Sequence, residues 1–212
     1  MKKRIDLVMF DLDGTLADTG HDLASSVNFT RAHFDLEPLP ERSIYAQVGR
    51  GVEYLIKHAL PEKSPHDFSH VLHVFLGHYE RHLLDRTVLY PGVRDVLDYF
   101  CAKRRVVVSN KMYRLTLAVV RGLGVEDCFD AIFGGDSAAE KKPHPALLHV
   151  ALRRFQLSAP SAADSDELST RAVEGIDDTT AELLAEHGVA TIQHLATSEP
   201  GDLCDRTLLP LD

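Results

Sequence analysis

The chain has 212 residues, of which 44% are hydrophobic and 26% are charged, and its formal net charge at pH 7 is −9. This composition is ordinary for a folded globular protein and argues against a disordered, fibrous or membrane-embedded chain. No apolar run is long enough to span a bilayer, and the three cysteines lack the spacing of a metal site. We therefore expect free thiols, a cytoplasmic location and no membrane partner.

The negative charge is concentrated in the last quarter of the chain. Residues 1–155 hold 21 Lys and Arg against 20 Asp and Glu, a balance of +1. Residues 156–212 hold 2 against 12, a balance of −10. A shift of this size indicates a boundary between two different parts of the chain.

A short apolar run at Ile5–Phe10 leads directly into two acidic residues, Asp11 and Asp13, and then Gly14. Its length and near-continuous apolarity predict a strand that is buried on both faces of a parallel sheet. Two carboxylates two residues apart on an extended strand point the same way, and Gly14 permits a sharp turn after them. We expect both acids at the carboxyl edge of the sheet, where ligands bind in open α/β folds.

The chain between residues 20 and 88 has helical periodicity, broken by prolines. We expect helices at His21–Phe34, Ser43–Leu60 and Pro65–Leu84. The second stretch contains Gly49-Arg50-Gly51. An arginine between two glycines suits an anionic substrate group, and an ordinary surface loop is the alternative interpretation.

Beyond residue 88, strands and helices alternate. Strands are expected at Arg105–Val108 and Phe129–Phe133, and helices at Arg94–Ala102, Tyr113–Gly122 and Ala146–Phe155. The first of these strands ends in Ser109-Asn110-Lys111, and Lys141-Lys142-Pro143-His144-Pro145 precedes the last helix. A hydroxyl and backbone N–H groups at a strand end can bind phosphoryl oxygens.

Together these strings resemble the motifs of the haloacid dehalogenase-like phosphohydrolases, and the match runs from the start of the chain to about Leu157. Asp11-Leu12-Asp13-Gly14-Thr15 resembles the first motif, Ser109 at a strand end the second, and Lys-Pro-x-Pro at residues 142–145 the third. The resemblance implies an α/β fold with a Rossmann-like parallel sheet in residues 1–19 and 88–157. A helical cap of the four-helix type would be inserted at residues 20–87.

The resemblance further implies a phosphatase, similar to phosphoglycolate phosphatases, that hydrolyses a small phosphorylated metabolite through an aspartyl-phosphate. Asp11 would be the nucleophile and Asp13 the general acid/base. Lys142 would neutralise the nucleophile and the phosphate, with Lys141 as the alternative. The residues expected to contact the substrate are Thr15, Arg50, Ser109 and Asn110.

Magnesium is the cofactor that the resemblance implies, bound by Asp11, by the backbone carbonyl of Asp13 and by a third acid. The family supplies this acid from a fourth strand that ends in Gly-Asp-x-x-x-Asp, and we find no such string after Leu157. Asp178 is our choice for the third ligand, beside Asp177, and Asp164 is a further candidate.

The last part of the chain resembles something else. Residues 158–167, rich in Ser, Ala and Asp, have the composition of a linker. Residues 168–212 resemble a small α-helical module of the helix-hairpin-helix type, with a helix stop at Gly188-Val189 and a second helix from Thr191-Ile192. The acidic charge argues against a nucleic-acid partner and favours a protein partner.

Two functional hypotheses follow from this organisation. The first is the active phosphatase. The alternative is a catalytically impaired fusion or chimera whose acidic helical tail is a protein-interaction module. Without a fourth strand, the strand that bears Asp11 would have an open edge. Either the tail covers that edge, or another chain does, or the body is poorly stable.

Overall fold

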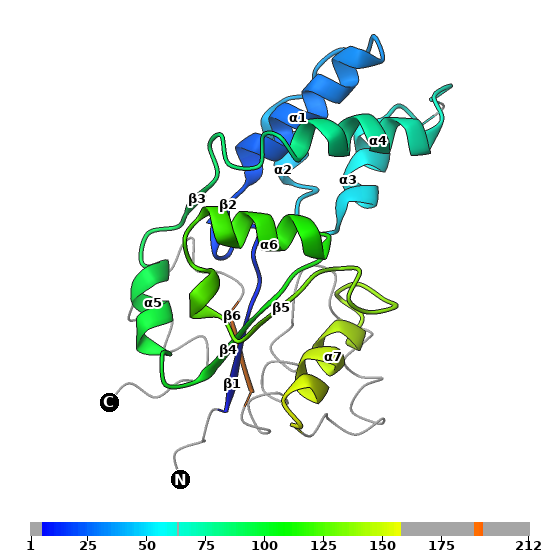
Figure 1. Ribbon diagram of the computed structural model, residues 1–212. Coiled ribbons are helices and arrows are strands. Elements are labelled where there is room, and N and C mark those ends of the chain that lie inside the picture. Colours follow the sequence, from blue (N-terminus) through cyan, green and yellow to red (C-terminus); the bar gives the residue numbers. More distant parts are fainter. Residues whose placement is uncertain (1–5, 63, 158–188, 193–212) are drawn as a thin grey trace.

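A computed structural model describes residues 6–62, 64–157 and 189–192 of the chain (Figure 1). The core elements in chain order are β1 (Leu7–Phe10), α5 (Val93–Tyr99), β4 (Arg104–Val108), α6 (Tyr113–Gly122), the short 3-10 helix η1 (Glu126–Cys128), β5 (Ala131–Phe133), α7 (Ala146–Arg154) and β6 (Val189–Ile192). The inserted helices are α1 (Gly20–His33), α2 (Glu41–Tyr45), α3 (Val52–Ala59) and α4 (Phe68–Tyr79). None of the helices in the described ranges combines the length and the apolarity that a membrane span requires.

The described core strands form one parallel sheet in the order β5-β4-β1-β6. In Figure 1, α5 and α6 cover one face of this sheet and α7 covers the other. Parallel strands covered by helices on both faces are the α/β architecture that the sequence predicts, and this prediction is confirmed. The boundaries of the core strands and helices differ from the expected ones by at most three residues, as is usual for helix and strand ends. In the cap, α4 ends at Tyr79, five residues before the expected end of that helix.

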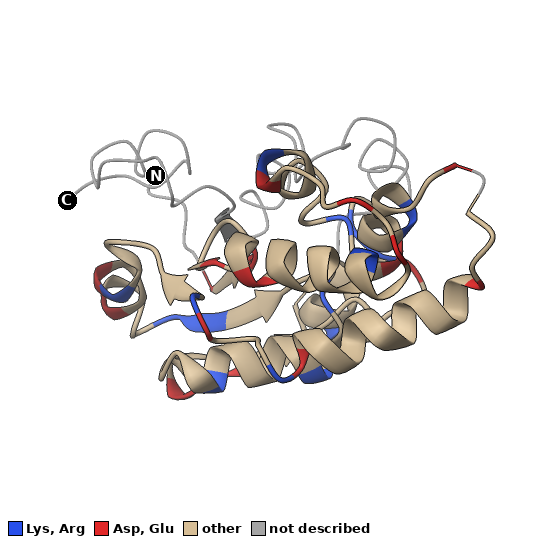
Figure 2. Cartoon of the chain, turned by 90° about the horizontal axis from the view of Figure 1, so that it is seen from above, with Lys and Arg blue, Asp and Glu red and all other residues tan. Residues whose placement is uncertain are grey.

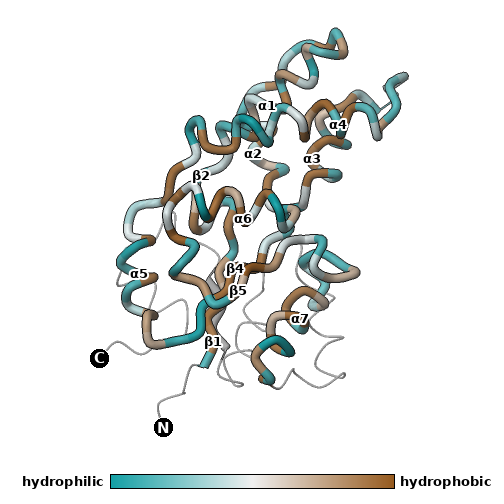
Figure 3. The backbone as a smooth tube through the Cα atoms, viewed as in Figure 1, coloured by the Kyte–Doolittle hydropathy of each residue, from teal (hydrophilic) through white to brown (hydrophobic). Residues whose placement is uncertain are grey.

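Strand β1 is completely enclosed. Val8 and Phe10 pack into the cluster that contains residues of α5 and α6, and Leu7 and Met9 into the cluster around α7. All four side chains are at most 2% exposed. Figure 3 shows the hydrophobic colouring of the central strands. Continuous apolarity at residues 7–10 thus reflects burial on both faces, as the strand pattern predicts.

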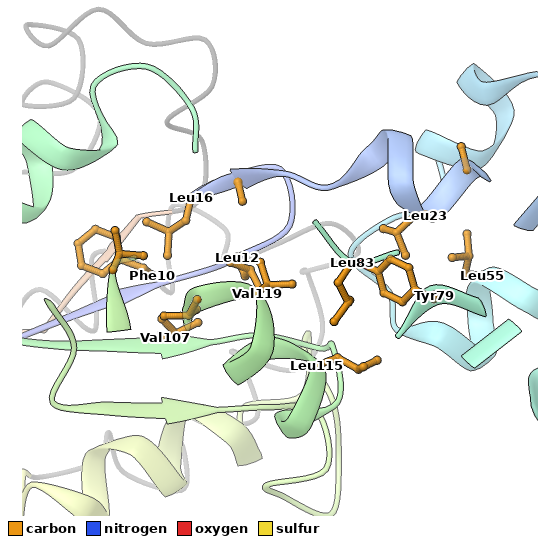
Figure 4. Packing of buried hydrophobic residues seen from close by; sticks show 14 of the residues in the cluster. Phe10, Leu12, Leu16, Leu23, Leu55, Tyr79, Leu83, Val107, Leu115 and Val119 are labelled. Atoms are coloured by element: carbon orange, nitrogen blue, oxygen red, sulfur yellow. The ribbon is translucent and has the colours of Figure 1, made fainter. Parts of the chain in front are cut away.

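The cap and the core share one hydrophobic cluster. Figure 4 shows this packing running from Phe10 and Val107 in the sheet, through Val119 of α6, to Leu23 and Tyr79 in the cap. The cap is therefore packed against the core rather than joined to it only by the chain. Acidic and basic residues occur on both the cap and the core (Figure 2).

Two short strands carry the chain between core and cap. β2 (Ala17–Asp18) pairs antiparallel with β3 (Val88–Leu89). Next to them, the buried Asp22 carboxylate accepts hydrogen bonds from the backbone N–H groups of Arg86 and Thr87 and from the Thr87 hydroxyl. The first helix of the cap is thereby tied to the segment that returns to the core.

The single helix expected at Ser43–Leu60 is two helices, α2 and α3. The break contains Gly49 and Gly51, whose φ angles are +96° and +92°. These are left-handed conformations that an α-helix does not contain and that glycine adopts without strain. The prediction of a continuous helix was wrong because it gave the apolar spacing more weight than the two glycines.

The tail contributes a strand to the core. β6 lies parallel to β1, with Leu7 opposite Val189 and Phe10 opposite Ile192. The helix expected from Thr191-Ile192 is therefore wrong at these residues, and so is the expectation that no fourth strand exists. Of the three arrangements considered for the edge of β1, the structure has the one in which the tail covers it. The rest of the expected helix-hairpin-helix module lies outside the described residues.

We predict that proline substitutions in β6 destabilise the fold. Successive residues of a strand direct their backbone N–H groups to opposite edges, so only one of Ala190 and Thr191 donates a backbone hydrogen bond to β1. Replacing that residue by proline removes the hydrogen bond, whereas proline at the other position does not. The variant without the hydrogen bond should lose about 2 to 3 kcal/mol, or roughly 4 to 12 °C in melting temperature, and the other should lose less. Thermal unfolding followed by circular dichroism measures the difference. Two variants with the parental melting temperature would contradict a stabilising role for β6.

Candidate active site

Asp11 is the first residue beyond β1, at the carboxyl edge of the sheet. Its Oδ1 lies 3.0 Å from Nζ of Lys142, and the two side chains are 20% and 11% exposed. Lys141 points elsewhere and forms an ion pair with Glu53 of the cap helix α3. Of the two lysines that the sequence offered, the geometry thus brings Lys142 to the carboxylate of Asp11.

Asp13 lies in the tight turn that follows. The carbonyl of Leu12 accepts hydrogen bonds from the next residues of this turn, and Gly14 adopts a φ of +81°. The Asp13 carboxylate is held by the hydroxyl of Thr19, at 2.6 Å, and by Nζ of Lys111, at 2.9 Å. The turn therefore presents the second acid beside the first with its side chain already oriented.

Lys111 is a site residue to which the sequence assigned no role. Its ammonium donates to the hydroxyl of Tyr79, in the cap helix α4, at 2.9 Å and pairs with Asp13. Burial alone would lower the pKa of Lys111, but the Asp13 carboxylate and the Tyr79 oxygen raise it above its ordinary value. Burial raises the pKa of Tyr79. The one sequence feature that could have indicated a role in the site is the position of Lys111 directly after Ser109-Asn110.

Ser109 and Asn110 follow β4. Ser109 is 1% exposed, its backbone N–H donates to the carbonyl of Phe133, and its hydroxyl oxygen accepts from the backbone N–H of Lys111. Asn110 donates from Nδ2 to the carbonyls of Gly49 and Lys142, and its Oδ1 accepts from the backbone N–H of Lys142. Asn110 therefore fixes Lys142 and holds the cap loop against the core.

The two remaining predicted substrate residues lie in different surroundings. Thr15 is 1% exposed in the turn after Asp13. Arg50 donates from Nη1 to the hydroxyl of Tyr54 at 2.6 Å, and its guanidinium lies 4.9 Å from the centroid of the same ring. Thr15 lies directly after the acidic turn, whereas Arg50 contacts Tyr54 within the cap.

The glycine pair after β5 allows close approach of the backbone. A Cβ atom on Gly134 would lie 2.1 Å from the backbone nitrogen of Tyr113, and one on Gly135 would lie 2.4 Å from the carbonyl oxygen of Asn110. Asp136 accepts a hydrogen bond from the backbone N–H of Tyr113 at the start of α6. Any side chain at the two glycines would displace the segment that carries Asn110.

A cleft opens between the cap and the core next to Asp13. Its lining is mostly apolar and comes from both parts, and it includes Asp13, Lys111, Leu23, Val52, Leu55 and Phe75. A mainly apolar cleft with a few convergent polar groups is typical of a small-molecule site.

The residues that would hold magnesium are described only in part. In the ranges that the structure describes, no three His, Cys, Asp or Glu side chains form a metal cluster. Asp164, Asp177 and Asp178 lie outside those ranges. The donors that are present, the Asp11 carboxylate and the Asp13 carbonyl, are hard oxygen atoms. They fit magnesium, which takes one or two carboxylates together with water and substrate phosphate.

The comparison with family models matches residues 8–163 to the haloacid dehalogenase-like hydrolases. This range covers more than half of the chain and includes Asp11, Asp13, Ser109 and Lys142. The chain belongs to the haloacid dehalogenase-like hydrolase family. The resemblance inferred from the three motifs is thereby confirmed.

Individual relatives agree with this assignment. The chain is 39% identical over 155 residues to a phosphoglycolate phosphatase of Chromobacterium violaceum, covering 69% of this chain and 70% of the relative. It is 34% identical to a phosphoglycolate phosphatase of Colwellia psychrerythraea, covering 73% and 72%. A crystal structure of a predicted phosphoglycolate phosphatase from Haemophilus somnus superposes with a TM-score of 0.68 at 29% identity, covering 72% of each chain.

Proposed function

We propose that this hydrolase is a magnesium-dependent phosphatase that cleaves a small phosphomonoester through an aspartyl-phosphate. The observation that carries the proposal is the ion pair between Asp11 and Lys142 at the carboxyl end of β1. Asp13 follows two residues later, in the tight turn after the strand, and pairs with Lys111. A carboxylate beside a cation can attack phosphorus, and a second carboxyl group can move protons. The relatives named phosphoglycolate phosphatase support the reaction class.

The proposed reaction has two steps. Asp11 attacks phosphorus, the bond to the ester oxygen breaks, and Asp13 gives a proton to the leaving alcohol. Asp13 then takes a proton from water as the water oxygen attacks the phosphorus of the aspartyl-phosphate. Inorganic phosphate leaves and the Asp11 carboxylate is restored. Throughout, the ammonium of Lys142 offsets the charge of the phosphoryl group.

Magnesium, when bound, offsets the repulsion between the carboxylates and the anionic phosphate. Asp11 and the carbonyl of Asp13 would hold it, and Asp178 is the proposed third ligand. Ser109, with Thr15, would bind the phosphoryl oxygens. Asn110 acts by positioning Lys142, since its side chain is already engaged by backbone groups.

The alternative, an impaired enzyme with a protein-binding tail, is motivated by one observation. Within residues 6–62, 64–157 and 189–192, no three His, Cys, Asp or Glu side chains are grouped so that they could hold a metal ion. The acidic segment at residues 168–212 would then be the functional part, in contact with a protein partner. A cytoplasmic location is proposed for either function.

We expect phosphate release from small phosphomonoesters to require magnesium. Because the site has hard oxygen donors and an anionic substrate, removal of the metal with a chelator should lower the rate by at least about 100-fold. A phosphate-release assay over a panel of phosphomonoesters, with magnesium, with chelator, and with magnesium restored, measures this.

The same assay separates the two functions. Recovery of the rate after magnesium is restored supports the phosphatase. A folded protein that releases no phosphate from any member of the panel would reject it and favour the impaired enzyme. Activity that is unchanged by the chelator would reject the metal requirement alone.

A further inference from the structure

The cleft between the cap and the core contains a positive charge that the proposed reaction does not use. Among the lining residues that the structure describes, Lys111 is the only lysine or arginine. It is 7% exposed, and most of the surrounding side chains are apolar. A buried ammonium in such surroundings interacts strongly with any anion that reaches it.

The cleft lies on the side of the site where the leaving group would be. Asp13 lines it, whereas Asp11 and Lys142 do not. In the proposed reaction, phosphorus lies at Asp11 and the ester oxygen lies at Asp13. The cleft therefore receives the alcohol part of the substrate, and Lys111, 2.9 Å from Asp13, lies within reach of its first atoms.

The ammonium of Lys111 is held in a fixed position by two oxygen atoms. It contacts Oδ1 of Asp13 and the hydroxyl of Tyr79, each at 2.9 Å. An ammonium has three N–H donors in tetrahedral directions. These two oxygens occupy two of the directions, and the third can serve an anionic group in the cleft that Lys111 lines.

Arg50 is the other cation that could recognise an acid, and the structure places it differently. Gly49 and Gly51 line the cleft, but Arg50 does not. Its guanidinium is engaged with Tyr54 within the cap. Because Lys111 lines the cleft and Arg50 does not, Lys111 is better placed to recognise an anionic group of the substrate.

We propose that Lys111 is a specificity residue that recognises a carboxylate on the leaving alcohol. In the phosphate ester of a 2-hydroxy acid, one carbon atom separates the ester oxygen from the carboxylate, so an ester oxygen at Asp13 brings the carboxylate within reach of Lys111, 2.9 Å from Asp13. The proposal rests on the proposed phosphatase function. Lys111 contacts the substrate as a specificity residue and transfers no proton.

The test compares 2-phosphoglycolate with its neutral amide, which has nearly the same shape. We expect the parent protein to have the higher kcat/KM for the acid. Lys111→Met should lower the ratio of the two kcat/KM values by about tenfold to a hundredfold, the effect of a lost charge-assisted hydrogen bond. Lys57→Met, an exposed lysine of α3, is the matched control and should leave the ratio unchanged.

The ratio separates specificity from structure, because a variant that only distorts the site lowers both values together. An equal loss for both compounds in Lys111→Met, or loss of the preference in Arg50→Met, would overturn the proposal. Should Lys111→Met fail to fold, Lys111→Gln, which keeps a hydrogen-bond donor but removes the charge, takes its place, and the same fall in the ratio is expected. An unchanged ratio in Lys111→Gln overturns the proposal. A parent protein that hydrolyses neither compound contradicts the phosphatase function instead.

Discussion

Asp11→Asn is expected to lower phosphate release by about 10⁴-fold or more. The amide keeps the size of the side chain but is a poor nucleophile, so the aspartyl-phosphate cannot form. The change also removes the anionic partner of Lys142, which lies 3.0 Å away. The rate is measured as phosphate released from the best substrate at saturating magnesium.

A matched control is Asp95→Asn, which makes the same chemical change on the exposed surface of α5. It should keep the parental rate. Circular dichroism of both variants verifies that they are folded. A folded Asp11→Asn protein that works at the parental rate would refute a covalent role for Asp11 and with it the proposed reaction.

Lys111→Met is expected to cause a large loss of stability. The variant leaves the Asp13 carboxylate, 7% exposed, without its cationic partner. Breaking a buried pair in this way costs about 3 to 5 kcal/mol, which corresponds to a fall of roughly 6 to 20 °C in melting temperature. Thermal or urea unfolding of the purified protein measures it.

The control is Lys141→Met, which removes a lysine whose ion pair with Glu53 is exposed. It should cost less than about 1 kcal/mol. Asp13→Asn combined with Lys111→Met should recover part of the stability, because the unpaired charge is gone. If Lys111→Met and Lys141→Met have the same melting temperature, the Asp13–Lys111 pair contributes no more than a surface contact.

The parts of the site that the sequence predicted are those carried by short local patterns. An apolar run followed by Asp11, Asp13 and Gly14 fixes a strand and a turn by nearest-neighbour rules, so the strand, the edge and the turn are found where the pattern predicts them. Ser109 follows its strand for the same reason. Such patterns need no knowledge of the rest of the fold.

What the sequence did not predict depends on contacts between distant residues. Asn110 reaches Gly49 and Lys142, which are 61 and 32 residues away, and Lys111 reaches Tyr79 at a separation of 32. An argument from local helix and strand propensities cannot identify partners that are so far apart in the sequence. The strand β6 was not predicted for a related reason. Its four residues have a mixed composition, and they form a strand only because the edge of β1 is there to pair with them.

The choice between Lys141 and Lys142 is one that the sequence alone could not make. Both precede the same proline-rich start of α7, and no local rule separates adjacent lysines. The structure does so because neighbouring side chains leave the backbone in different directions. One reaches Asp11 across the sheet edge and the other reaches Glu53 in the cap.

The origin of β6 has a consequence for how the protein is made. β1 is synthesised first, and β4 and β5 can pair beside it once residue 133 has left the ribosome. Its other neighbour is β6, which ends at residue 192. At typical elongation rates of about 5 to 20 residues per second, the second edge of β1 stays open for roughly 3 to 12 seconds after β5 is complete. During that interval the nascent chain presents an unpaired strand of apolar residues, the kind of edge that other chains and chaperones bind.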